Sequence, residues 1–318
     1  MSTHVGVSGR GTGDRLRAVF FAAAAPSIGC GHLYRCLALA DALRERGVDC
    51  RFAVPARSLE MVPALSLSEH DVMCLDFTAQ GLDEADLATI AQDGPFDLAV
   101  VDSYAVAEPF ERALRSVATV TMAIDDAPTR AHDADFVLDQ TYGRSPSAYR
   151  QLAPRARVLA GTDYALLRPQ FAAWRDYSLN RRIARGGRID RILVAFGGSD
   201  PDDFARPLLD RLQRDTDCAV TAILGSCHPA AAHLKAIARA SEGRVEVHEH
   251  RDDVAAVMAD CDLAIGAAGS MSWERCTLGL PTLLAVLAPN QDSIARALVD
   301  AGAAWCLGRS RDEAGNRL

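Results

Sequence analysis

Short apolar runs alternate with amphipathic helical patterns along most of the chain. The first run, AVFFAAA at 18–24, predicts a buried strand, and LYRCLALADALRERG at 33–47 predicts the helix that follows it. Gly47 is the expected end of this helix. The apolar face of the helix consists of Leu33, Cys36, Leu37, Ala40 and Leu43.

The same alternation continues through both halves of the chain. Further strands are predicted at 49–55, 71–77, 96–104, 119–126, 135–140, 191–198, 218–225, 245–250, 262–267 and 281–288. Helices are predicted at 84–92, 109–117, 203–215, 231–241, 254–261, 270–279 and 291–302. Apolar strands separated by helices form parallel sheets that helices cover on both faces. The expected fold class is therefore α/β, with two doubly wound, Rossmann-like domains that face a cleft at the carboxyl ends of both sheets.

The periodicity breaks between 141 and 188, which places the domain boundary in this region. The stretch NRRIARGGR at 180–188 is the expected linker. We therefore predict a first domain at 16–180 and a second domain at 181–318. Residues 1–15 are rich in Gly, Ser and Thr and lack the apolar core of a signal peptide, so a disordered extension is expected there.

Charge and length narrow the class of protein. The 318 residues carry 34 Lys and Arg against 42 Asp and Glu, a net charge of −8. This balance argues against a general binder of nucleic acid or acidic membranes. No run reaches the ~18 apolar residues that span a bilayer. We expect a cytoplasmic protein, a monomer by default, that acts on a small molecule.

The cysteines and histidines argue against a metal site. The nine cysteines are odd in number and form no Cys-x-x-Cys pair, which predicts reduced, mostly buried thiols. The eight histidines form no His-x-x-x-His pair and no paired spacing with cysteine. Neither a structural zinc ion nor another metal is therefore expected.

The turn IGCGHLYR at 28–35 places a histidine where a strand gives way to a helix. Gly29 and Gly31 let the backbone turn tightly and approach a ligand closely. A dinucleotide fingerprint needs a third glycine where Tyr34 stands, so that interpretation does not fit. His32 then either packs in an ordinary turn or serves as a general base, because an imidazole exchanges a proton near neutral pH.

Two polar features follow strands in the second half of the chain. In AFGGSDP, Gly197, Gly198 and Ser199 follow a strand. This turn either cradles a phosphate or is an ordinary connection between a strand and a helix. Asn290 and Gln291 place two amides at the end of another strand.

The stretch GAAGSMSWERCTLGLP is the richest in candidate chemistry. Gly269 and Ser270 precede a helix, and a loop of small residues at a helix start can hold a pyrophosphate. Glu274 lies about one turn into this helix, where a carboxylate can accept hydrogen bonds from a ribose diol. The spacing from Ser270 to Glu274 does not fit a capping box.

Carboxylates end two strands of the first half. Asp102 and Tyr104 end one strand, and Asp125, Asp126 and His132 follow another. Adjacent acids can bind a metal, but they serve equally well as helix caps or as partners of arginines, and we favour these structural roles. The Asp-x-Asp spacings do not lie in a strand-flanked acidic pocket, so a metal-dependent sugar transferase is not supported.

Seven motifs occur in a characteristic order between about 16 and 308. They are IGCGHLYR, VDSY, IDDAPTRAHDADFVLDQ, LAGTDYALLRPQF, ILVAFGGSDP, GAAGSMSWERCTLGLP and APNQ. Together they resemble the UDP-2,4-diacetamido-2,4,6-trideoxy-β-L-altropyranose hydrolase family, PseG, of pseudaminic acid biosynthesis. The resemblance implies the two-domain GT-B glycosyltransferase fold and a relation to the MurG transferases.

The resemblance also implies a reaction. Water replaces UDP at the anomeric carbon of a UDP-2,4-diacetamido-2,4,6-trideoxy sugar with inversion, without a metal or cofactor, on a route to surface or flagellin glycosylation. His32 would be the base that activates the water. The implied UDP-binding residues are Gly197, Gly198, Ser199, Gly269, Ser270 and Glu274. The implied sugar-binding residues are Gly29, Gly31, Arg35, Asp102, Tyr104, Asn290 and Gln291.

Some points depart from the family pattern or stay open. Cys30 stands between the two glycines, which should not prevent the turn. Arg35 is expected either to meet a phosphate or to orient a carboxylate such as Asp125. The chain ends soon after its last strand, where GT-B proteins usually have closing helices. The alternatives are a GT-B glycosyltransferase that uses a UDP-amino sugar donor and a catalytically silent nucleotide-sugar binder.

Overall fold

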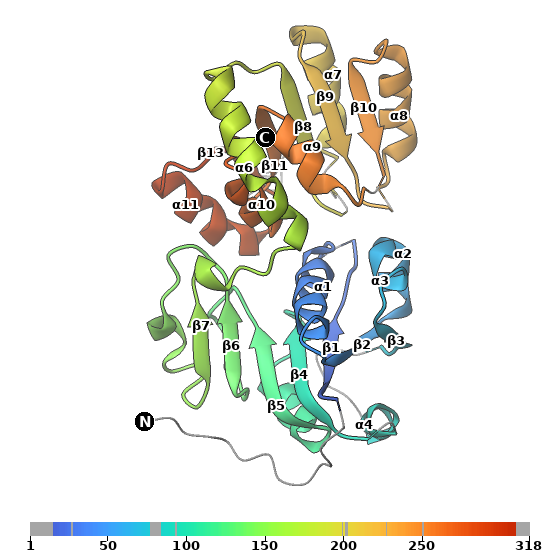
Figure 1. Cartoon of the computed structure of the whole chain (residues 1–318), viewed down its shortest axis with the longest axis vertical. Coiled ribbons are helices and arrows are strands. Elements are labelled where there is room, and N and C mark those ends of the chain that lie inside the picture. Colours follow the sequence, from blue (N-terminus) through green and yellow to red (C-terminus); the bar gives the residue numbers. More distant parts are fainter. Residues whose placement is uncertain are drawn as a thin grey trace.

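Each half of the chain forms its own parallel β-sheet (Figure 1). The computed structural model describes residues 15–26, 28–76, 84–92, 94–198, 200, 203–226, 228–249 and 251–309. The predicted α/β class with two Rossmann-like domains is confirmed. The predicted extension at 1–15 lies outside the described residues, apart from its last position.

The first sheet has the strand order β3-β2-β1-β4-β5-β6-β7, and all neighbouring strands are parallel. Its strands are β1 (Arg17–Ala22), β2 (Asp49–Val54), β3 (Asp71–Cys74), β4 (Phe96–Asp102), β5 (Ala118–Ile124), β6 (Phe136–Asp139) and β7 (Arg157–Ala160). The helices of this half are α1 (Gly31–Arg44), α2 (Ala56–Met61), α3 (Pro63–Ser66), α4 (Glu84–Ala91), α5 (Glu108–Ala113), and the short 3₁₀ segments η1 (Leu114–Ser116), η2 (Pro146–Tyr149) and η3 (Thr162–Tyr164). The strand order reverses between β1 and β4, so the loops that follow these two strands diverge and leave a crevice.

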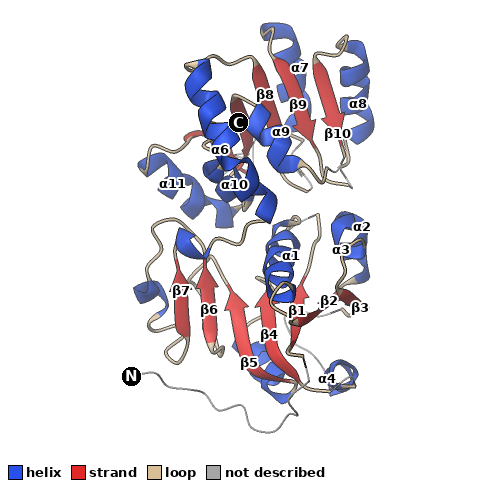
Figure 2. Cartoon of the chain, in the orientation of Figure 1, coloured by secondary structure: helices blue, strands red, loops and turns tan. Residues whose placement is uncertain are grey.

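The second sheet has the order β10-β9-β8-β11-β12-β13 and is also parallel. Its strands are β8 (Arg191–Ala195), β9 (Ala219–Ile223), β10 (Val245–His248), β11 (Leu263–Ala267), β12 (Thr282–Val286) and β13 (Trp305–Arg309). The helices are α7 (Ala205–Asp215), α8 (Ala231–Ala240), α9 (Val254–Asp260), α10 (Met271–Thr277), α11 (Asp292–Asp300) and the 3₁₀ segment η4 (Pro289–Gln291). Here the order reverses between β8 and β11. In Figure 2 the arrowheads of both sheets point toward the region between the domains, so the two crevices face each other.

The predicted apolar face of α1 packs under the first sheet. Leu33, Cys36 and Ala40 are fully buried there, and the Phe20 and Phe52 rings stack beneath them at 4.9 Å between centroids. Strands that are buried on both faces are apolar throughout, which is why the sequence pattern identifies them.

The predicted linker at 180–188 is wrong over most of its length. Helix α6 (Pro169–Arg185) occupies it and ends at Gly186, which adopts a left-handed φ of 58°. The helix packs on the second domain through Phe171, which is fully buried in that domain's core, and through polar side chains. The Ser178 hydroxyl donates to Leu278 O at 2.7 Å, and Arg182 Nη1 donates to Cys261 O at 2.7 Å. Because polar groups make much of this contact, no continuous apolar stripe marks the helix in the sequence. The domain boundary between 180 and 181 stays a prediction.

Four other elements were also not predicted from the sequence. Strands β7 and β13 were not predicted, because they are the outer strands of their sheets and most of their residues are exposed or only half-buried. The helices α2 and α3 were not predicted because they are too short to show a helical period. The cysteines follow the expectation only in part, because some of those in the described residues are buried and others are exposed. The buried thiols are Cys30, Cys36, Cys50 and Cys261, whereas Cys74, Cys276 and Cys306 are exposed.

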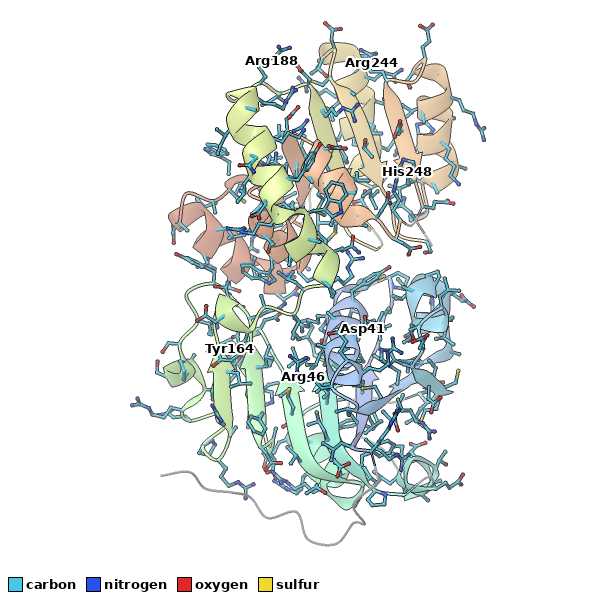
Figure 3. All side chains as sticks on the ribbon, viewed as in Figure 1. Asp41, Arg46, Tyr164, Arg188, Arg244 and His248 are labelled. Carbon is cyan, nitrogen blue, oxygen red and sulfur yellow. The ribbon has the colours of Figure 1, made fainter. Side chains whose placement is uncertain are left out.

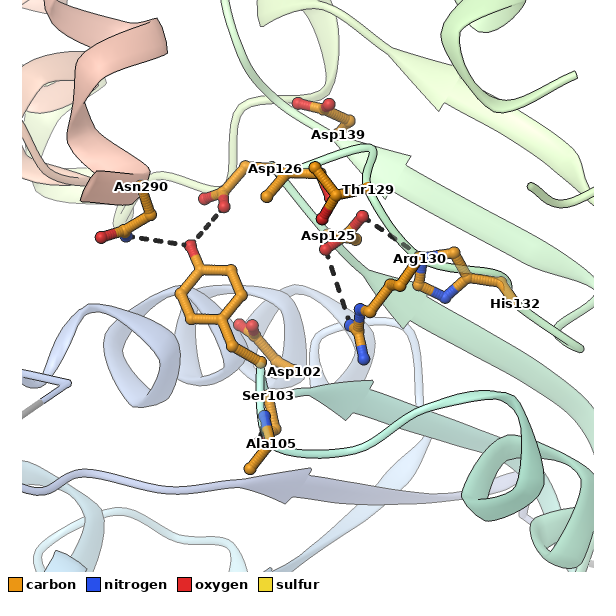
Figure 4. A network of polar contacts seen from close by, with 12 residues as sticks. Asp102, Ser103, Ala105, Asp125, Asp126, Thr129, Arg130, His132, Asp139 and Asn290 are labelled. Atoms are coloured by element: carbon orange, nitrogen blue, oxygen red, sulfur yellow. Dashed lines mark hydrogen bonds and ion pairs between the residues drawn. The ribbon is translucent and has the colours of Figure 1, made fainter. Parts of the chain in front are cut away.

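A buried charge network lies near the carboxyl ends of β5 and β6, and Figure 4 shows Asp125, His132 and Asp139 from it. His132 Nδ1 lies 2.7 Å from Glu111 Oε1, and His132 Nε2 lies 3.2 Å from Asp125 Oδ2. The Tyr149 hydroxyl donates to Asp139 Oδ2 at 2.9 Å and to the backbone oxygen of Asp125 at 2.8 Å. Burial alone would lower the pKa of His132, but its bonds to Asp125 and Glu111 raise that pKa to about 9.

This network predicts a pH-dependent stability. His132→Gln should lower the free energy of unfolding near neutral pH by about 3 kcal/mol, because two buried carboxylates lose their cationic partner. The pKa of His132 in the folded protein lies above the ~6.5 of an unfolded chain. Its stabilising contribution is therefore complete below about pH 6.5 and is lost as the pH rises through about 9.

Urea denaturation between about pH 6 and about pH 10 measures this contribution. The control is His233→Gln, which changes an exposed histidine on α8 and should keep the wild-type slope of stability against pH. A His132→Gln protein that loses stability with rising pH as steeply as the wild type would contradict the assignment.

Candidate functional site

A cavity of about 290 Å³ lies between the carboxyl ends of the two sheets, and both domains line it. The predicted residues on its wall are Gly29, Gly31, His32, Arg35, Tyr104, Gly197, Gly198, Gly269, Ser270, Glu274, Asn290 and Gln291. Asp102 is fully buried behind this wall, so it is not placed to contact a sugar directly. Ser199 lies outside the described residues. The binding roles of all these residues stay predictions.

His32 is held from behind by a carboxylate. It stands in the first turn of α1, and its Nδ1 lies 2.5 Å from Asp102 Oδ1 at the end of β4. Burial alone would raise the pKa of Asp102, but Arg35 and His32 hold it well below its usual range. Asp102 is therefore an anion that accepts the Nδ1 proton of His32. In the neutral tautomer that this bond favours, Nε2 is the nitrogen without a proton, and the ring lines the cavity.

Arg35 holds the carboxylates in place. Its Nε and Nη2 donate to the two oxygens of Asp102 at 2.5 and 2.6 Å, and its Nη1 donates to Asp126 Oδ2 at 2.7 Å. Of its two predicted roles, contact with a phosphate or orientation of a carboxylate, Arg35 has the second, and its partners are Asp102 and Asp126. The carboxylate that the sequence suggested, Asp125, instead contacts His132. It points away from the cleft because adjacent residues of an extended chain face opposite ways.

Tyr104 connects this cluster to the second domain. Its hydroxyl donates to Asp126 Oδ1 and accepts from Asn290 Nδ2 at 3.3 Å (Figure 4). Its ring meets the His32 ring edge to face at 4.7 Å between centroids. Burial and the neighbouring Asp126 raise the pKa of Tyr104, so the phenol stays protonated at neutral pH.

The glycine turns bring the domains into close contact. A Cβ at Gly31 would lie 2.6 Å from Ser270 Oγ, and a Cβ at Gly198 would lie 2.5 Å from Cys30 Sγ. Within the second domain, a Cβ at Gly225 would lie 1.9 Å from the oxygen of Gly198. Any larger side chain at these positions would force the loops apart.

A second contact bridges the cleft through Arg168, which was not among the predicted site residues. The Arg168 guanidinium lies over the Tyr34 ring at 5.2 Å from its centroid, and Nη2 donates to Glu274 Oε1 at 3.0 Å. Glu274 Oε2 is buried without a hydrogen-bond partner in the described structure. Burial raises the pKa of Glu274, although Arg168 opposes this effect. No turn or spacing in the sequence marks Arg168, because it precedes an unpredicted helix.

Within the residues that the structure describes, no group of three or more His, Cys, Asp and Glu side chains is arranged to hold a metal ion. In the same residues, no helix has both the length and the apolar character to cross a membrane.

Comparison with known proteins agrees with this architecture. Residues 192–314 match the Glycosyltransferase family 28 C-terminal domain. The crystal structure of MurG from Acinetobacter baumannii is similar with a TM-score of 0.63 and 15% identity, over 92% of this chain and 86% of that one. UDP-GlcNAc 2-epimerase from Neisseria meningitidis, solved with bound UDP-GlcNAc, has a TM-score of 0.57 and 14% identity, over 92% and 88% of the two chains.

Two curated proteins are similar to part of the sequence. The uncharacterized protein MJ1062 of Methanocaldococcus jannaschii is 23% identical over 81% of this chain and 53% of its own length. The spore coat polysaccharide biosynthesis protein SpsG of Bacillus subtilis is 32% identical over 55% of this chain and 50% of its own length. The chain spans about half the length of the curated relatives it matches. The two-domain fold is the GT-B fold that these solved structures share.

The contact between Gly198 and Cys30 gives a testable coupling. Gly198→Ala should lower the free energy of unfolding by about 1–3 kcal/mol, because the new methyl group overlaps the Cys30 thiol. Cys30→Ala alone should cost less, since it removes one sulfur atom. The double variant should recover much of the loss, because the next contacts of the new Cβ, at 3.3 and 3.4 Å, are far less severe.

Urea denaturation of the wild type, the two single variants and the double variant forms a double-mutant cycle. Losses that simply add in the double variant would show that the two domains do not meet at this point.

Proposed function

We propose that the chain is a metal-independent hydrolase that removes UDP from a UDP-2,4-diacetamido-2,4,6-trideoxy sugar, with His32 as the general base. The observation that carries this proposal is the 2.5 Å contact between His32 Nδ1 and the buried Asp102, on the wall of an interdomain cavity. An ionised partner at Nδ1 keeps Nε2 free to take a proton, which is what a base needs.

The proposed reaction is a single displacement at the anomeric carbon. The water oxygen forms a bond to this carbon while the bond to the UDP oxygen breaks on the opposite face, which inverts the configuration. The water proton passes to His32 Nε2, and UDP leaves with the electron pair of the broken bond. Because UDP is a stable anion, the site needs positive potential near the diphosphate more than a strong acid.

The second domain is proposed to bind UDP. Glu274 Oε2 is a buried acceptor without a partner, which suits a ribose hydroxyl. The turns at Gly197–Gly198 and Gly269–Ser270 line the same cavity, where backbone N–H groups can meet the diphosphate. The match to the family 28 C-terminal domain and the likeness to an epimerase solved with UDP-GlcNAc support this arrangement.

The sugar is proposed to lie against the first domain, with Asn290 and Gln291 reaching it from the second domain. All three of Tyr104, Asn290 and Gln291 line the cavity, and Gly29 and Gly31 let the backbone approach the ligand. Arg35 and Asp102 act on His32 and not on the sugar. A cytoplasmic monomer without a cofactor, in pseudaminic acid biosynthesis for surface or flagellin glycosylation, completes the proposal.

A GT-B glycosyltransferase with a UDP-amino sugar donor is the second candidate. The family 28 match and the likeness to MurG favour it. The two candidates differ in what accepts the sugar. Purified protein is incubated with the UDP-2,4-diacetamido sugar in a chelating buffer, and UDP and free sugar are followed. Release of UDP and free sugar without an added acceptor supports the hydrolase. Release of UDP that requires a hydroxyl acceptor, without free sugar, supports the transferase.

His32→Gln tests the assignment of the base. We expect kcat to fall by ~10²–10⁴-fold, the usual scale for loss of a general base. Inhibition by UDP should stay close to wild type, because UDP is proposed to contact the second domain. His233→Gln serves as the matched control and should keep full activity, since this residue is exposed on α8. A near-normal kcat for His32→Gln would overturn the assignment of the base.

A further inference from the structure

Arg275 is a buried cation beneath the second-domain wall of the cavity. It lies on α10 and is 1% exposed. Its Nη2 donates to the oxygen of Ala267 at 2.7 Å and to Ser272 Oγ at 3.0 Å. Its Nε and Nη1 are buried and have no hydrogen-bond partner among the described residues. The guanidinium therefore has no carboxylate partner there.

The guanidinium lies directly behind the cavity wall. Ala267 and Gly269 line the cavity, and Arg275 is bonded to the backbone of the first of them. A Cβ at Gly266 would lie 2.2 Å from the oxygen of Ala195 and 3.0 Å from Arg275 Nη1, so a glycine at this position lets the neighbouring strand and the guanidinium both approach closely. The guanidinium thus lies against the end of β11, whose last residue lines the cavity.

Burial lowers the pKa of Arg275 to about 10, although the nearby Glu274 partly opposes this effect, so the side chain is still charged at neutral pH. A charge that is buried without a counterion costs free energy. An anion bound in the cavity would repay this cost, because the charge acts through a medium of low dielectric constant.

The other cations of the wall are already neutralised. Arg35 pairs with Asp102 and Asp126. Arg168 pairs with Glu274, and Arg251 pairs with Asp253 at 2.5 Å. None of these three offers the cavity an unbalanced positive charge.

Two further arginines of the second domain lie away from the cavity. Arg188 and Arg244 lie at the end of the second domain farthest from the first (Figure 3). Both also have acidic neighbours, Asp190 and Asp217. Unlike the three arginines that line the cavity, the buried guanidinium of Arg275 forms no ion pair with a carboxylate of the described structure.

We propose that Arg275 is a positioning residue that attracts the diphosphate of UDP electrostatically, through the backbone of Ala267, without touching it. This inference rests on the proposed function. It also explains how a chain of net charge −8 can hold a ligand with a strongly anionic diphosphate.

Binding of UDP and of uridine distinguishes charge from structure. Isothermal titration calorimetry in metal-free buffer is carried out on the wild type, Arg275→Met, Arg275→Gln and Arg275→Lys. Both neutral variants should weaken UDP binding by about tenfold or more and change uridine binding by less than about twofold, because uridine carries no charge. Arg275→Lys should recover part of the UDP affinity.

The possible failures are distinct. Equal weakening of UDP and uridine binding by the neutral variants would mean that Arg275 only supports the fold, and unchanged UDP binding would mean that its charge is not felt; either result overturns the inference. Arg275→Gln can keep one bond to Ala267 and replaces Arg275→Met if the latter does not fold, as judged by thermal unfolding. A wild-type chain that binds neither ligand would instead overturn the proposed function.

Discussion

The ion pair between Arg35 and Asp102 is the interaction on which the rest of the site depends. It joins α1 to the end of β4, the two elements that flank the crevice of the first sheet. Burial alone would lower the pKa of Arg35 and raise that of Asp102, yet each keeps the other charged. The ionised Asp102 then fixes the proton of His32 on Nδ1. This buried salt bridge therefore decides which nitrogen of the neutral His32 ring carries the proton.

The two walls of the cavity divide the chemistry between them. The first domain places two carboxylates around a single guanidinium, so its charges serve an imidazole and leave no positive charge for a phosphate. The second domain provides glycine-rich backbone and a guanidinium without a carboxylate partner among the described residues. A ligand with an anionic half and a neutral half, such as a nucleotide sugar, matches this division. The orientation of the proposed substrate follows from charge before any individual contact is considered.

Sequence reasoning succeeds here where periodicity or turn chemistry carries the information. Apolar strands and the turn around His32 are visible because glycine and burial on both faces leave a clear pattern. Helix α6 and Arg168 are not visible, because many of their contacts to the second domain are polar and their partners lie far away in sequence. The choice between Asp125 and Asp126 as the partner of Arg35 likewise depends on which way each side chain leaves the chain. Such a choice is fixed only once β5 is aligned beside β4.

The cross-cleft contacts make the chemistry depend on how the domains are held together. Tyr104 bonds to Asn290, Arg168 bonds to Glu274, and Gly31 lies against Ser270. In each contact, the second residue lies on the wall that is proposed to bind UDP. The first residue lies beside His32 or, for Arg168, just before α6. A ligand that bonds to Glu274 or Asn290 must share these residues with the bridges already present. Binding and domain contact therefore use the same groups, so occupation of the second-domain wall changes the surroundings of Tyr104 and, through its ring, those of His32.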